Sequence, residues 1–258
     1  VALLFAKQLN PNVLGYFPSD HDNLLVFNAD RLSPNPAALS VAAHELQHLI
    51  HFRADPDEAA WLNEGFSMLT EHVLGWRDHR RALNAFFRAP STQLTSFGIG
   101  PSLNADYGAA LSWTLYLYER FGEEILRIIA ADATNGMASI AVALANHGLP
   151  PIEVVYADWV LANGLRDFAN GYGYTSLPDG LEPTPLTRTI ASYPITLERT
   201  LEQYGSDYYR LDNLPETLVL ELTMLPEALL LPTPANSGNW VWYSQRGDNI
   251  NPRLTRHF

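Results

Sequence analysis

The sequence predicts an α+β protein in two parts, a mostly helical part over residues 1–181 and a β-rich part over residues 182–258. Three observations support this prediction. Apolar residues recur at helical spacing through most of residues 40–166, and a short apolar run at 23–28 is typical of a strand. After residue 194, short runs with alternating apolar and polar residues are separated by turn residues, which favours further strands.

The elements of the first part follow in order along the chain. The strand at 23–28 forms a small N-terminal β part, and the first helix is expected at 40–52, with Ser40 suited to be its N-cap. Gly122, Gly136 and Gly148 stand where glycine commonly ends a helix. The further helices are expected at 58–74, 77–88, 105–121, 123–132, 137–147 and 151–166.

The second part differs from the first in composition and in residue pattern. Residues 171–188 are rich in Gly, Pro and Thr and are expected to form a linker or an irregular cover. Beyond them we expect strands in TLERTL (196–201), DYYRL (207–211), TLVLELTM (217–224), NWVWYS (239–244) and RLTRHF (253–258).

Composition excludes several classes of function. The chain has 16 Lys and Arg residues against 28 Asp and Glu residues, so its net charge is −12, and both nucleic acids and anionic membranes prefer a positive surface. It contains no cysteine, which excludes disulfides, thiolate metal ligands and cysteine nucleophiles. No window approaches 18 unbroken apolar residues, so we expect no membrane span; the oligomeric state is left open.

A metal-binding motif lies in the first expected helix. His44-Glu45-Leu46-Gln47-His48 places two histidines four residues apart, which is one face of a helix. This spacing allows both imidazoles to bind one zinc ion, and Glu45 beside them can act as general base toward a water molecule.

A third ligand is expected from the next helix. Pro56 lies eight residues from both His48 and Glu64, so a helical hairpin that turns at Pro56 brings these two side chains level. Catalytic zinc usually has three protein ligands, and Glu64 completes the set. Glu71, seven residues further, is either a hydrogen-bond acceptor for a ligating histidine or a solvated helix charge. His51 is interpreted as a packing or surface residue.

These motifs resemble those of the gluzincin metallopeptidases, the thermolysin-like class, and are most similar to the hyicolysin-type bacterial enzymes. The resemblance implies a zinc cofactor on His44, His48 and Glu64, with Glu45 as catalytic base. It also implies that Tyr107 stabilises the tetrahedral intermediate, while the alternative is a tyrosine that merely packs at a helix start. The matching blocks are GYF (15–17), HELQHLIHF (44–52), WLNEGFSM (61–68) and DYGAALSWTLYLYERFG (106–122).

Two later blocks, at 158–167 and 242–258, are similar to segments of large secreted bacterial metalloproteases, including the immune inhibitor A type. This likeness implies a bacterial enzyme that is secreted or held at the cell surface, made as a larger precursor, with a β-sandwich after the catalytic part. The interval between His48 and Glu64 is shorter than in thermolysin, so substrate-pocket details are not transferred.

The leading hypothesis is therefore zinc-dependent endopeptidase activity on proteins or peptides. An extended substrate is expected to pair with the edge of the strand at 23–28, by analogy with gluzincins. Two alternatives stay open. The chain can be a catalytically silent, metalloprotease-like surface or binding protein, or a metal hydrolase that acts on a non-peptide bond.

Overall fold

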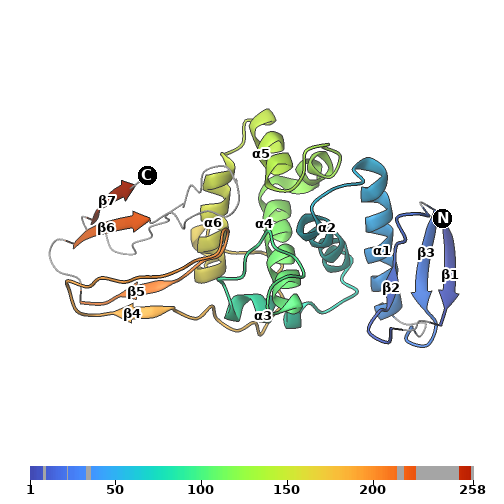
Figure 1. Cartoon of the computed structure of the whole chain (residues 1–258), viewed down its shortest axis with the longest axis horizontal. Helices are drawn as coiled ribbons and strands as arrows, with labels where there is room; N and C mark the ends of the chain where they lie inside the picture. Colours follow the sequence, from blue (N-terminus) through green and yellow to red (C-terminus); the bar gives the residue numbers. More distant parts are fainter. Residues whose placement is uncertain (8–9, 22, 33–35, 214–217, 225–249, 257–258) are drawn as a thin grey trace.

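A computed structural model of the chain describes residues 1–7, 10–21, 23–32, 36–213, 218–224 and 250–256. The fold is mixed, with six α-helices and few strands among the described residues, which is compatible with the predicted α+β class. A small sheet lies at one end, the helices fill the middle, and the later strands lie at the other end (Figure 1). None of the helices in these residues combines the length and the apolar character needed to cross a membrane.

The N-terminal sheet has three strands, β1 (Ala2–Ala6), β2 (Gly15–Tyr16) and β3 (Leu24–Asn28), in the order β1-β3-β2. The predicted strand at 23–28 is confirmed as β3. The expectation that it offers a free edge is wrong, because β1 pairs with it in parallel over its whole length and β2 pairs with it at Val26 and Phe27. Its flanking strands carry no clear alternation, so periodicity did not reveal them.

Helices α1 (Pro36–Ala54) and α2 (Ala60–Val73) form the expected hairpin, with the turn at residues 55–59. The prediction that Ser40 caps α1 is wrong, because the helix already begins at Pro36, a residue that suits the first turn of a helix. Ser40 lies inside α1, is buried, and donates a hydrogen bond to Glu71 of α2.

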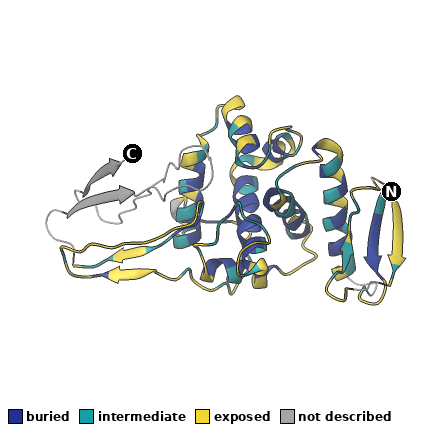
Figure 2. Cartoon of the chain, viewed as in Figure 1, coloured by how far each residue is buried: buried dark blue, intermediate teal, exposed yellow. Residues whose placement is uncertain are grey.

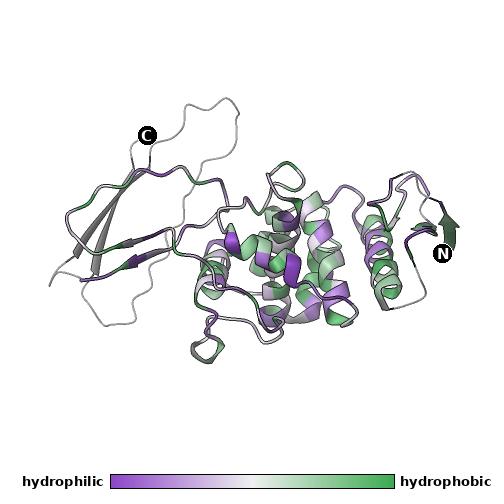
Figure 3. Ribbon diagram, turned by 90° about the horizontal axis from the view of Figure 1, so that it is seen from below, coloured by the Kyte–Doolittle hydropathy of each residue, from purple (hydrophilic) through white to green (hydrophobic). Residues whose placement is uncertain are grey.

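Helices α3 (Arg80–Arg88), α4 (Leu103–Ile129), α5 (Met137–Asn146) and α6 (Ile152–Leu165) pack with α2 around the main core. The predicted helices at 105–121 and 123–132 form one continuous element with a break at Gly122, whose φ of 81° and ψ of 174° are not helical. The inward helix faces are buried (Figure 2), and hydrophobic residues are concentrated in this helical body (Figure 3).

Two glycines allow the helices around α4 to approach closely. A Cβ on Gly65 of α2 would lie 2.7 Å from Thr114 Cγ2, and a Cβ on Gly108 of α4 would lie 2.1 Å from the Ala82 carbonyl oxygen of α3. The Thr114 hydroxyl also donates a 3.0 Å hydrogen bond to the carbonyl of Gly65. Helix α2, which carries Glu64, is therefore held firmly against α4.

A second, smaller hydrophobic cluster joins α1 to the sheet. Leu25 and Phe27 of β3 pack with Val41 and Leu49 of α1, and this cluster is separate from the main core that contains α2. The residues of α1 and α2 that face each other across the hairpin are mostly polar, so the boundary between the two clusters is where the candidate site lies.

The segment that follows α6 and a short 3₁₀ helix (Phe168–Asn170) is the irregular cover that the sequence predicted. Tyr174 is buried and donates a 2.5 Å hydrogen bond to Asn163 Oδ1 of α6. The backbone N–H groups of Thr175 and Ser176 donate to the carboxylate of Glu119 on α4.

The later strands pair in two parallel sets, β4 (Arg188–Ile190) with β5 (Tyr209–Leu211) and β6 (Leu218–Met224) with β7 (Ile250–Arg256). These strands include parts of the segments predicted at 207–211, 217–224 and 253–258. The prediction of a strand at 196–201 is wrong, because these exposed residues do not belong to any strand. The strand predicted at 239–244 lies outside the described residues, and the boundary at residue 182 stays a prediction.

Candidate metal centre

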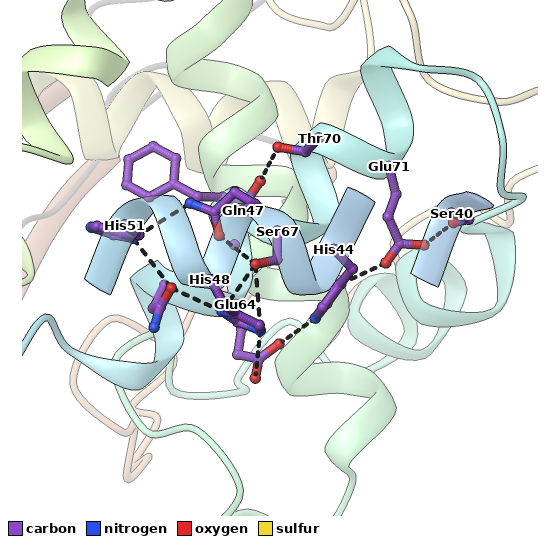
Figure 4. A network of polar contacts seen from close by, with 12 residues as sticks. Ser40, His44, Gln47, His48, His51, Glu64, Ser67, Thr70 and Glu71 are labelled. Carbon is purple, nitrogen blue, oxygen red and sulfur yellow. Dashed lines mark hydrogen bonds and ion pairs between the residues drawn. The ribbon is translucent and has the colours of Figure 1, made fainter. Parts of the chain in front are cut away.

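Three side chains with metal-ligating atoms converge across the α1–α2 hairpin. His44 and His48 lie one helical turn apart on α1, and each offers its Nε2 atom toward the carboxylate of Glu64 on α2 (Figure 4). The distance from His44 Nε2 to Glu64 Oε2 is 3.2 Å, and that from His48 Nε2 to Glu64 Oε1 is 3.7 Å. The three ligand atoms lie within 4.8 Å of one another.

The hairpin geometry explains this convergence. The i, i+4 spacing puts both histidines on the α1 face that meets α2. The turn near Pro56 sets His48 level with Glu64, as expected from their equal separation from Pro56 in the sequence. On α2, Glu64, Ser67 and Glu71 follow one another at helical spacing along the face that meets α1.

Glu71 fixes the orientation of His44. Its carboxylate is fully buried, accepts a 2.6 Å hydrogen bond from His44 Nδ1 and another from the Ser40 hydroxyl, and lies 3.2 Å from Arg77 Nη1. Because Nδ1 of His44 donates to this carboxylate, Nε2 is the ring nitrogen that can bind a metal once its own proton has left. Of the two interpretations that the sequence left open for Glu71, the structure favours the hydrogen-bond acceptor.

His48 is oriented by residues that the sequence analysis missed. Its Nδ1 lies 3.0 Å from Asn63 Oδ1 and 3.1 Å from the hydroxyl of Ser67, which itself donates to Gln47 Oε1 at 2.5 Å. Asn63 and Ser67 lie four residues apart on α2, next to Glu64. This spacing is the feature of the sequence from which their role beside His48 could have been predicted. A neutral His48 thus also directs its Nε2 toward Glu64.

The metal-free site carries a proton on His44. Burial disfavours the charged ring, but hydrogen bonds and charges from Glu64 and Glu71 outweigh burial and raise the pKa of His44 to about 10. For Glu71, burial opposes ionisation, yet the hydrogen bond from His44 and other neighbours keep its pKa below the usual value. A metal ion that binds here takes the place of the Nε2 proton, so its affinity falls as the pH falls.

The residues present fit a zinc ion. Two imidazole nitrogens and one carboxylate are a catalytic zinc set, and bonds of about 2.0–2.1 Å in a tetrahedron separate ligand atoms by about 3.3 Å. The observed separations of 3.2 Å and 3.7 Å are close to this value. Glu64 Oε2 is also buried, 3.2 Å from His44 Nε2, so a cation that replaced the proton on this nitrogen would be within reach of both atoms.

Glu45 lies beside the ligand set. Its residue is only 7% exposed. Burial, with a further contribution from the charge of Glu64, raises the pKa of Glu45 to about 7, although the charge of His44 and the nearby backbone N–H of Phe17 act in the opposite direction. A carboxylate with a pKa in this range is suited to move protons near neutral pH.

Tyr107 lies in the first turns of α4, where Ser102 caps the helix by accepting a hydrogen bond from Ala105 N. Its ring contacts Phe97 edge-on at 5.0 Å. Burial and the negative charges of Glu64 and Glu45 raise the pKa of Tyr107 well above its usual value, so the hydroxyl keeps its proton at neutral pH. The hydroxyl is close enough to Glu64 and Glu45 for their charges to act on it.

Replacing Glu71 by glutamine is expected to weaken zinc binding by about 10–100-fold. The amide preserves the shape of the side chain but removes the negative charge that polarises His44 and pairs with Arg77. Competition against a chromophoric chelator measures the effect. Glu124→Gln, which breaks an exposed ion pair with Arg127, is the matched control; equal affinities in the two variants would argue against this role for Glu71.

Comparison with known proteins adds no family assignment, since no protein-family model matches this sequence and no curated protein is similar to it.

Proposed function

We propose that this protein is a zinc-dependent endopeptidase. The observation that carries the proposal is the convergence of His44, His48 and Glu64, with buried Glu45 beside them. The resemblance of the HELQH and NEG motifs to gluzincins supports the same function and underlies the further proposal that the enzyme acts outside the cell.

His44, His48 and Glu64 would hold the zinc ion through two nitrogens and one carboxylate. When bound, such an ion lowers the pKa of a water molecule to about 7 and polarises a carbonyl group. Glu71 and Asn63 keep both histidine rings in the orientation and tautomer that leave Nε2 free.

Glu45 supplies the proton transfers. Its carboxylate accepts a proton from the attacking water and then passes it to the amine that leaves from the scissile bond. No covalent intermediate with the protein is required. The Tyr107 hydroxyl, which stays protonated at neutral pH, can donate a hydrogen bond to the oxygen that becomes negative during attack.

The outer edge of β2 is the surface we propose for an extended substrate. β3 is paired on both sides, whereas β2 is the last strand of its sheet among the described residues. The backbone of Phe17, directly after β2, lies close enough to Glu45 to affect its pKa. A peptide that pairs with this edge would therefore run past the proposed base.

Removal and return of the metal tests the proposal. Casein hydrolysis by the purified chain is expected to stop after treatment with a zinc chelator and dialysis, and to return on addition of one equivalent of zinc. A protein that binds zinc but cleaves no casein, gelatin or peptide library would instead be a silent binding protein. Cleavage of esters without cleavage of peptides would also refute the endopeptidase proposal.

A further inference from the structure

A second group of potential ligands lies one helical turn beyond the candidate zinc site. His51 is on the last turns of α1, while Asp55 and Glu58 are in the turn that leads to α2. One ligand atom from each of these three residues lies within 4.8 Å of the others. The sequence suggested that His51 is a packing or surface residue; its ring packs edge-on against Phe66, with the ring centroids 5.3 Å apart.

The group contains buried polar atoms without hydrogen-bond partners. His51 is 1% exposed and Asp55 is 4% exposed. His51 Nε2, Asp55 Oδ2 and Glu58 Oε2 are each buried and unpaired, and so is Asn135 Oδ1 of the neighbouring turn. Buried polar atoms are paired in most native structures, so these four unpaired atoms in two neighbouring turns indicate a missing partner.

In His51, Glu58 and Asn135 the opposite atom of the side chain is engaged, which holds the unpaired atom in place. His51 Nδ1 lies 3.2 Å from Asn63 Oδ1, which can only accept, and 3.5 Å from Gln47 Nε2, which can only donate. The shorter contact favours a proton on Nδ1 and a free lone pair on Nε2. Glu58 Oε1 accepts hydrogen bonds from Ala59 N at 2.5 Å and from Gly136 N at 2.7 Å. Asn135 Nδ2 donates to the Asp57 carbonyl at 2.6 Å.

The missing partner must be positive. The group sets two carboxylates, those of Asp55 and Glu58, beside one imidazole, so negative charge gathers there. No ion pair among the described residues involves Asp55, Asp57 or Glu58. A cation bound among these atoms would balance the two carboxylates.

We propose that His51, Asp55 and Glu58 bind a second divalent cation, of the zinc or manganese type, distinct from the ion held by His44, His48 and Glu64. A neutral imidazole together with carboxylate oxygens is a ligand set that transition ions prefer, whereas calcium and magnesium prefer oxygen alone. The ion would join the end of α1 to the start of α2 and so hold the hairpin that sets Glu64 level with His48.

Metal counting on matched variants of the full chain tests this site. The wild-type protein, stripped of metal and titrated with zinc, is expected to bind about two equivalents. Asp55→Asn combined with Glu58→Gln preserves side-chain volume and should bind about one. His44→Gln, which removes a ligand of the first site only, should also bind about one, and added zinc should still raise its thermal unfolding midpoint.

Asp132→Asn provides the control, since Asp132 is a neighbouring carboxylate that Thr134 already satisfies and that offers no atom to the group. It should still bind about two equivalents. The proposal is overturned if the variant with Asp55→Asn and Glu58→Gln binds as much zinc as the wild type, or if His44→Gln binds none. Since these readouts do not involve hydrolysis, they are independent of whether the chain is an endopeptidase.

Discussion

Replacing Glu45 by glutamine is expected to lower the rate of peptide hydrolysis by about 10²–10⁴-fold, the usual contribution of a general acid–base group. The amide fills the same space but can neither take a proton from water nor return one to the leaving amine. Glu45 is not among the three ligand residues, so the zinc content of the variant should equal that of the wild type. Initial rates on casein and metal analysis on the same samples measure both quantities.

Glu123→Gln is the control for this change, because Glu123 is an exposed carboxylate on α4 and its loss alters the net charge in the same way. It should leave the rate unchanged. If Glu45→Gln cleaved casein as fast as Glu123→Gln, another group would have to be the base. If it lost zinc as well, the role of Glu45 would be structural.

Replacing Glu64 by glutamine should abolish both zinc binding at the first site and hydrolysis. This change removes the anionic ligand from the trio, so we expect a loss of affinity larger than the roughly 10–100-fold cost of losing an outer hydrogen-bond partner. The side-chain volume is nearly conserved and Glu64 is held on α2 by the contact of Gly65 with α4, so the fold should persist.

Zinc titration, casein assays and far-UV circular dichroism together separate loss of the ion from loss of the fold. Activity that recovers at high zinc would support a ligand role, because excess metal compensates for weak binding. Undiminished affinity in Glu64→Gln would show that the glutamate is not a ligand. The pKa of His44 should also fall toward its usual value, since Glu64 is one of the two carboxylates that raise it.

Local periodicity was enough to predict the helices and the convergence of His44, His48 and Glu64. His44 and His48 lie on one face of α1 because residues four apart do so in any helix. Glu64 lies opposite His48 because both are eight residues from the turn at Pro56. Neither argument requires knowledge of the rest of the protein. The helical hairpin predicted from the sequence is therefore close to the one in the structure.

Features that depend on partners distant in sequence were harder to predict. Whether β3 had a free edge depended on β1 and β2, which are short and show no alternation. Ser40 looked like a cap because capping residues favour helix starts, but its hydroxyl is used by Glu71, 31 residues away. The unpaired atoms near His51 could not be predicted either, because whether a polar atom finds a hydrogen-bond partner depends on how the folded protein packs.

The position of the proposed ligands His44, His48 and Glu64 at the boundary between two hydrophobic clusters has a mechanical consequence. His44 and His48 belong to the helix that packs on the N-terminal sheet, whereas Glu64 belongs to the helix that packs in the main core. An ion that binds all three is a cross-link between these units. Its departure would remove this link, so a bound ion is expected to couple the unfolding of the two units.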